Sequence, residues 1–183
     1  MILLTLSACA GKQNAAGEPA PINRSTTTTS TSTPPSAAPV PPGDPVPCTA
    51  ALLSGSVQPM NSSAGNRYVT LTVENTSQQV CTLQGFGRLQ LLTAGGEPLP
   101  TNAERNLDPV PTLVTLRPDA TAGKILHWSV LAAEGDSLTG PCQPKATAIR
   151  VTPPDEEESF DVDYEFGSVC NDGQIDTSAY FPN

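Results

Sequence analysis

Histidine, aromatic residues and positive charge are all scarce in this chain of 183 residues. His127 is the one histidine, and the five cysteines include no C-x-x-C pair, so a zinc site and a catalytic thiol with its base are both disfavoured. Nine basic side chains stand against eighteen acidic ones, and the net charge of -9 disfavours nucleic acid as a partner. Aromatic residues make up only 4% of the chain, so the core needs support from disulfides.

The first nine residues predict a bacterial lipoprotein signal. An apolar run over residues 1–6 leads into Leu6-Ser7-Ala8-Cys9, which is typical of the lipobox after which such a signal peptide is cut. No Lys or Arg precedes the run, so we interpret residues 1–8 as a truncated lipoprotein signal peptide. Cys9 is then lipidated, and two acyl chains hold the protein on the outer face of the cytoplasmic membrane. The alternative is a core strand that ends in cysteine.

Residues 9–47 predict a disordered tether rich in Thr, Ser and Pro. The densest run covers residues 25–35, and the segment holds too little apolar surface to offset its backbone entropy. The prolines that follow favour a polyproline II path, which at about 3.1 Å per residue reaches on the order of 100 Å. We therefore expect the folded domain to extend into the cell wall. A glycosylated tether and a plain spacer remain alternatives.

With Cys9 lipidated, four cysteines remain, which is an even number in an oxidising compartment. Four cysteines allow three connectivities, and the sequence does not separate them rigorously. We favour Cys48–Cys81 and Cys142–Cys170, because each pair closes a loop of about 30 residues beside predicted strands. Loops of that size stabilise by about 3–4 kcal/mol each in the chain-entropy account.

Residues 48–183 have the length of one domain and predict an all-β fold. In residues 68–74 the alternation places Val69, Leu71 and Val73 on one face, and short segments of this kind recur between Gly, Pro and Asn or Asp. The segments expected to be strands are 68–74, 80–83, 88–92, 111–116, 124–131, 147–152 and 160–166, with a hairpin-type turn at 94–97. This pattern predicts a single antiparallel β-sandwich, immunoglobulin-like, with a small β-barrel as the alternative.

The order and spacing of several blocks resemble a family of secreted actinobacterial domains. The blocks are Ala64-Gly65-Asn66-Arg67-Tyr68, Cys81-Thr82-Leu83-Gln84-Gly85-Phe86, Gly95-Gly96-Glu97-Pro98-Leu99, Leu116-Arg117-Pro118, Trp128, Cys142, Val151-Thr152-Pro153-Pro154 and Cys170. The family is catalogued as domain of unknown function 4232, and the resemblance implies an extracytoplasmic all-β domain without known catalytic residues. Two positions depart from the pattern: Asp119 stands where a turn glycine is usual, and Gly87 where proline is common.

All the excess negative charge falls after residue 154. In residues 160–166 the alternation turns Asp161, Asp163 and Glu165 to solvent, and Asp172 follows in an Asn-Asp-Gly turn. These four residues are the candidate surface for a metal or a partner. Same-face strand carboxylates stand too far apart to hold calcium alone, so a solvated face is the simplest interpretation. Calcium held with a neighbouring loop, and docking of a cationic partner, remain alternatives.

We predict no catalytic residue, no cofactor and no metal. His127 is interpreted as a structural histidine, and its neighbour Trp128 as the core tryptophan of the sandwich. The predicted function is that of a non-catalytic cell-envelope lipoprotein whose domain binds a wall component or an envelope protein. We expect a monomer that touches the membrane only through its lipid anchor. The alternative is an extracytoplasmic hydrolase with an atypical carboxylate site.

Overall fold

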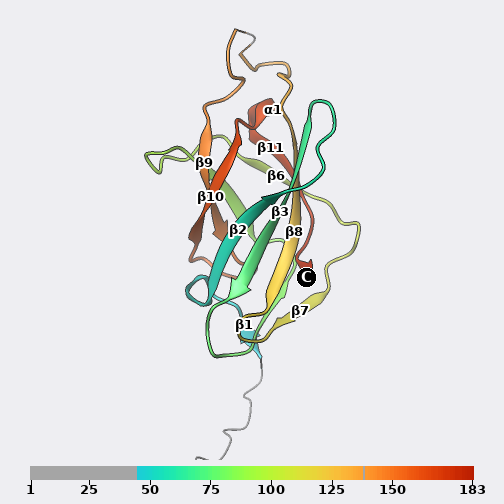
Figure 1. Cartoon of the computed structure of the whole chain (residues 1–183), viewed down its shortest axis with the longest axis vertical. Coiled ribbons are helices and arrows are strands. Elements are labelled where there is room, and N and C mark those ends of the chain that lie inside the picture. Colours follow the sequence, from blue (N-terminus) through green and yellow to red (C-terminus); the bar gives the residue numbers. More distant parts are fainter. Residues whose placement is uncertain (1–44, 138) are drawn as a thin grey trace, which may run out of the picture. The chain divides into compact units, whose positions relative to one another are not determined.

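A computed structural model describes residues 45–137 and 139–183 of the chain. The predicted signal peptide, Cys9 and nearly all of the predicted tether lie outside these residues. The strands are β1 (Val46–Pro47), β2 (Leu53–Pro59), β3 (Asn66–Asn75), β4 (Cys81–Gln84), β5 (Arg88–Leu92), β6 (Asn102–Arg105), β7 (Leu113–Leu116), β8 (Thr121–Ser129), β9 (Ala146–Thr152), β10 (Phe160–Gly167), β11 (Gln174–Thr177) and β12 (Phe181–Pro182) (Figure 1).

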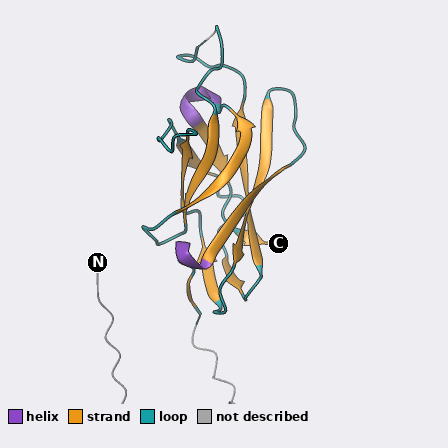
Figure 2. Cartoon of the chain, turned by 60° about the vertical axis from the view of Figure 1, so that its left-hand side comes forward, coloured by secondary structure: helices purple, strands orange, loops and turns teal. Residues whose placement is uncertain are grey.

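Helical structure is limited to two short segments of the described chain, the 3-10 turn η1 (Ala50–Leu52) and α1 (Cys170–Gly173) (Figure 2). α1 is itself irregular, because Asn171 and Asp172 have left-handed backbone angles. Neither segment has the length or the apolar character that crossing a membrane requires. The described domain therefore depends on its sheets for its architecture.

Three sheets form a sandwich. The largest has six strands in the order β2-β3-β8-β11-β6, with β12 also paired to β8. The other two have three strands each, in the orders β10-β9-β5 and β1-β4-β7. Val69 and Leu126 of the large sheet pack against Ile149 of β9, while Val73 packs against Leu83 of β4. The large sheet thus forms one layer, and its inner face covers both smaller sheets.

The predicted all-β sandwich is confirmed, and most predicted strands are present. Val69, Leu71 and Val73 are buried on one face of β3, as the alternation indicated. Trp128 is a core residue with only 2% of its surface exposed. Most pairings are antiparallel, but β1 pairs in parallel with β4, and β6 pairs in parallel with β11. The immunoglobulin-like topology remains a prediction.

Both disulfides are present with the favoured connectivity, Cys48–Cys81 and Cys142–Cys170. The first anchors the residue after β1 to the start of β4, within the cluster of buried side chains under the β1-β4-β7 sheet. The second joins the long connection between β8 and β9 to α1. Each bridge therefore fixes a segment that makes few ladder hydrogen bonds of its own.

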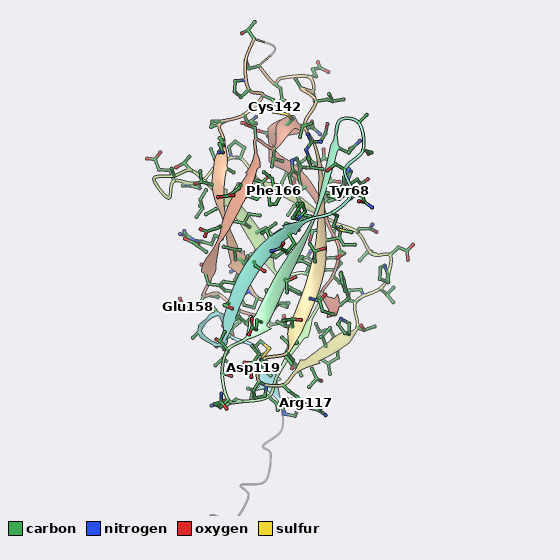
Figure 3. All side chains as sticks on the ribbon, viewed as in Figure 1. Tyr68, Arg117, Asp119, Cys142, Glu158 and Phe166 are labelled. Atoms are coloured by element: carbon green, nitrogen blue, oxygen red, sulfur yellow. A yellow bond between two sulfur atoms is a disulfide. The ribbon has the colours of Figure 1, made fainter. Side chains whose placement is uncertain are left out.

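The two departures from the family pattern have clear backbone reasons. Asp119, in the turn before β8, has a φ of 63°, and aspartate tolerates this left-handed conformation well (Figure 3). Gly87 has a φ of 66°, and a Cβ built there would lie 2.3 Å from the carbonyl oxygen of Thr152. Proline, whose φ is fixed near −65°, cannot adopt the backbone that the chain has at Gly87.

Candidate ligand-binding groove

Four side chains form a row across the outer face of the six-stranded sheet. Tyr68 of β3 lies opposite His127 of β8, and His127 lies opposite Asp176 of β11. Asp176 in turn is the register partner of Glu104 on β6. Their strand neighbours such as Leu126 point into the core, and side chains alternate along a strand, so the row faces outward. We call these four residues the outer-face row.

His127 is held in place from three sides. Its Nδ1 lies 2.9 Å from Oδ2 of Asp176, and because a carboxylate only accepts, Nδ1–H donates this bond. Its Nε2 lies 2.9 Å from Oδ1 of Asn66, a carbonyl oxygen that accepts a hydrogen bond. The ring of Tyr68 stacks on it with centroids 4.3 Å apart and an interplanar angle of 17°. Both ring nitrogens are therefore engaged, and the imidazole acts as a fixed, flat surface.

A groove of about 570 Å³ runs along the outer-face row. Its apolar walls come from Tyr68, Ile125 and Phe181, extended by Met60 and Pro109. Tyr68 lies beside the upper part of β3 and β8 as seen in Figure 3. A hollow of this size with apolar walls and a few polar groups is the usual form of a site for a small ligand.

Carboxylates outnumber cations in the described lining of this groove. Glu104, Asp108 and Asp176 line it together with the guanidinium of Arg105. Arg105 lies 5.4 Å over the ring of Phe86, which engages part of its charge. Within the described ranges, neither Glu104 nor Asp108 has a side-chain hydrogen bond or an ion pair. The groove therefore carries negative charge with free acceptor oxygens.

Lys124 lies on the opposite, inner face of β8 and is fully buried. Its Nζ donates to the carbonyl oxygen of Phe86 and lies 4.9 Å from the centre of the Tyr180 ring. Burial, with a smaller contribution from the nearby positive charge of Arg105, lowers the pKa of this amine from 10.5 to about 7. Because no part of it reaches solvent, Lys124 affects stability rather than ligand binding.

The acidic strand β10 has the expected geometry. Asp161, Asp163 and Glu165 are exposed, while Val162 and Tyr164 between them are buried. Asp161 accepts two hydrogen bonds from Arg150 of β9, at 2.8 and 2.9 Å, and this guanidinium lowers the pKa of the Asp161 carboxyl. One of the three strand carboxylates is therefore already paired.

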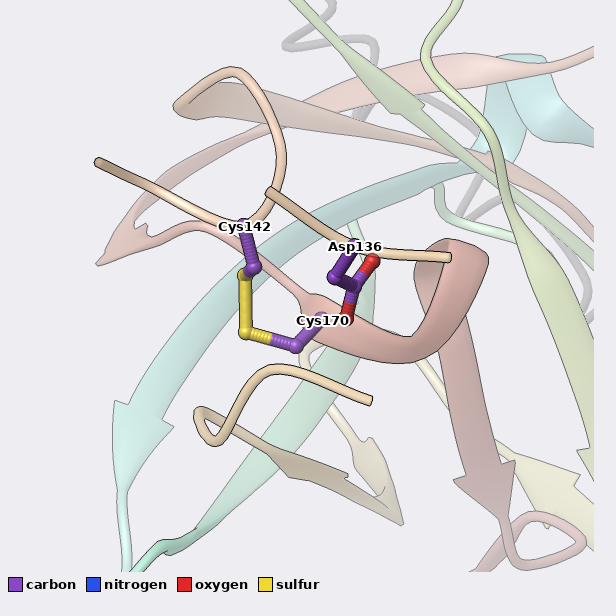
Figure 4. Close-up of side chains that lie close together, drawn as sticks. All are labelled: Asp136, Cys142 and Cys170. Atoms are coloured by element: carbon purple, nitrogen blue, oxygen red, sulfur yellow. A yellow bond between two sulfur atoms is a disulfide. The ribbon is translucent and has the colours of Figure 1, made fainter. Parts of the chain in front are cut away.

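Asp172, the fourth residue of the predicted surface, lies in α1 with a φ of 53°. Among the described residues, the one group of His, Cys, Asp or Glu atoms close enough to share a metal is Asp136 with Cys142 and Cys170. That group contains none of the four predicted residues. Both of its sulfurs also form a disulfide, so the thiolates that a metal would need are not present (Figure 4).

Asp136 has a structural role beside that disulfide. Its carboxylate accepts hydrogen bonds from the backbone N–H groups of Ala133 and Asn171, at 2.9 and 2.7 Å, and from the side chain of Gln143. These bonds to the charged form, with the Ala133 bond first, lower the pKa of Asp136. The carboxylate thus ties the connection between β8 and β9 to α1.

Sequence reasoning missed the outer-face row. His127 was interpreted as a structural histidine, and it is well bonded, but its side chain is 26% exposed and lies on a groove rather than in the core. The available signal was alternation: Tyr68 faces away from Val69, and His127 faces away from Trp128. The missing information was strand order, because residues far apart in the sequence become neighbours only through the register of four strands.

A family model described as a domain of unknown function, DUF4232, matches residues 48–180 of the chain. No curated protein and no solved structure matches it significantly. The family description assigns no activity, so the chemistry of the groove is the available basis for a function.

Proposed function

The chain belongs to the DUF4232 family, and we propose that its sandwich is a non-catalytic binding domain that holds a saccharide segment of the cell wall in the outer-face groove. The observation that carries this proposal is the rigid Tyr68–His127 stack on the wall of that groove. A flat ring surface packs against the C–H face of a pyranose, and surrounding polar groups bond its hydroxyls. The groove supplies both kinds of surface.

The position of this stack in the sheet supports a role in ligand recognition. Tyr68 and His127 lie on the two central strands β3 and β8, which pair over nine residues from Asn66–Ser129 to Glu74–Thr121. Sites built on paired strands are held more rigidly than sites on loops. A rigid platform loses little side-chain entropy on binding, so more of the contact energy appears as affinity.

A binding role suits His127 better than a catalytic one. A general base needs a nitrogen that can reach substrate, and the two ring nitrogens here are bonded to Asp176 and Asn66. The alternative function, a hydrolase with an atypical carboxylate site, has one observation in its favour. Glu104 and Asp176 are register partners in the same groove, and glycosidases use two carboxylates.

The proposed location rests on the predicted N-terminal lipoprotein signal. We place the protein on the outer face of the cytoplasmic membrane through lipidated Cys9, as a monomer, with residues 9–47 as the tether that reaches into the wall. An envelope protein is the alternative partner. Leu107, Val110 and Leu113 favour it, because these large apolar side chains are each more than 60% exposed along one stretch of chain beside the groove.

The test is co-sedimentation of the full oxidised chain, carrying Cys9→Ala, with insoluble cell-wall glycan stripped of protein. We expect binding that Tyr68→Ala weakens at least tenfold and that Tyr68→Phe, which keeps the stacked ring, largely retains. Equal binding by all three proteins, or no binding, would contradict the proposal. Release of soluble sugar from the sediment that Glu104→Gln abolishes would favour the hydrolase instead.

A further inference from the structure

Unpaired negative charge is a further feature of the groove. Its described lining holds three carboxylates, of which Glu104 and Asp108 have no partner and Asp176 shares only Oδ2 with His127. Arg105 in the same lining offsets one of these charges, and a neutral sugar hydroxyl would leave the rest of the negative charge without compensation. A positively charged group on the ligand would instead form charge-assisted hydrogen bonds with them, which are about twice as strong as neutral ones.

The geometry also indicates whether this positive charge belongs to a metal ion or to an ammonium group. A bare divalent cation needs several oxygens converging at about 2.3–2.6 Å. Among the described residues, the carboxylates of this groove do not form such a group, since the one candidate cluster lies at Asp136. A primary ammonium has three N–H donors that bond separate acceptors or water, so it needs no closed cage of oxygens and can be part of a larger ligand that fills the groove.

The charge and the aromatic wall act on the same ligand. Tyr68 and Glu104 are the two ends of the outer-face row, with His127 and Asp176 between them. A ligand that stacks on Tyr68 and extends along the row therefore brings its substituents toward Asp176 and Glu104. This arrangement favours a rigid ring that carries an amine over a flexible basic chain.

Building on the proposed function, we infer that the groove selects amino sugars whose amine is free, that is, glucosamine-type units of a wall glycan that are not N-acetylated. Acetylation removes the positive charge and adds an acyl group beside Glu104 and Asp176. The groove would thus distinguish glycans by their N-acetylation and not by their sugar backbone.

The experiment compares two trisaccharides of one backbone by isothermal titration calorimetry. The full oxidised chain with Cys9→Ala is titrated at about pH 6, where the amine is protonated, with chitosan trisaccharide and with fully N-acetylated chitotriose. We expect the free-amine sugar to bind at least tenfold more tightly. Glu104→Gln should remove most of this difference, while Glu97→Gln, the same change in an exposed turn outside the groove, should leave it intact.

Each other outcome overturns the inference in a distinguishable way. Equal binding of the two sugars would refute selection for the amine but leave a saccharide-binding groove. Binding of neither sugar, with Tyr68-dependent sedimentation on wall glycan retained, would refute the amino-sugar class alone. If tetralysine binds as tightly as the free-amine sugar, and Tyr68→Ala does not weaken the sugar, the groove recognises charge without a ring, and the inference fails. Loss of the sedimentation itself would remove the proposed function as well.

Discussion

The buried amine of Lys124 makes the stability of the domain depend on pH in a way that one substitution removes. Its Nζ has the Phe86 carbonyl as hydrogen-bond acceptor and the Tyr180 ring nearby, and no described carboxylate forms an ion pair with it. Lys124→Met keeps a long, unbranched side chain of similar volume in the same space and removes the ionisable group. Comparing the two proteins isolates the titration of this one side chain.

The sign and size follow from the pKa. Burial lowers it from 10.5 in the unfolded chain to about 7 in the folded one, so between these values the unfolded state binds more protons. The free energy of unfolding therefore rises with pH in this window, by up to about 1.4 kcal/mol per pH unit. Allowing for partial titration near pH 7, the wild-type protein gains about 2 kcal/mol relative to Lys124→Met between pH 7 and pH 9.

The assay is urea unfolding of both proteins at half-unit steps from pH 6 to pH 9, with the difference in unfolding free energy plotted against pH. Taking the difference cancels the contributions to the unfolding free energy of all groups that titrate equally in both proteins. Keeping below pH 10 avoids Tyr180, whose burial raises its pKa and whose stabilising effect would be lost at higher pH. Lys145→Met, at an exposed position, is the control and should give a flat difference. A flat line for Lys124→Met would refute the reasoning.

Three further predictions concern the backbone and the loops. Gly87→Ala should cost more than about 2 kcal/mol in urea unfolding, because its Cβ would collide with the backbone, whereas Gly96→Ala, with open space around it, should cost about 1 kcal/mol. The double variant Cys142→Ala with Cys170→Ala should lose about 3–4 kcal/mol, measured the same way; an unchanged midpoint would argue against the loop-closure account. The pKa of Asp136 is lowered, so its stabilising bonds should be lost as pH falls below about 4; amide exchange at its bonded N–H groups should then accelerate in the wild type, and Asp136→Asn should show no such step.

Local sequence patterns were sufficient to predict a strand when its own residues alternate between apolar and polar side chains. The alternation of Val69, Leu71 and Val73 placed β3, and the alternation of Val162 with Asp161 and Asp163 placed β10. β2 was missed because its residues Leu53–Pro59 include Ser, Gly and Pro and hold few large apolar side chains. β6 was missed because all four of its residues are exposed, so no buried face marks it.

The candidate site could not be predicted because it is a property of register rather than of any segment. Glu104 and Asp176 lie in strands that pair in parallel at the edge of the large sheet, and a sequence pattern does not indicate which strands become neighbours. His127 was considered only as a lone histidine beside Trp128. Its role depends on Asp176 and Asn66, which reach it from the strands on either side.

The two sets of carboxylates therefore have different physical roles. Asp163 and Glu165 lie on β10, an edge strand that packs beside another edge strand, β2, and charges at such a position discourage pairing with other chains. Their density in the sequence made them conspicuous, but the one aromatic side chain in the described lining of the hollow that they border, Phe166, packs edge-on against Trp128 and Tyr164 rather than forming a stack like that of Tyr68 and His127. Glu104 and Asp176 do not belong to a run of acidic residues in the sequence. In the structure, however, they line the same groove as Tyr68 and His127. The strength of a charge pattern in the sequence is thus a poor guide to binding in this fold, and the large-sheet groove is the place to test first.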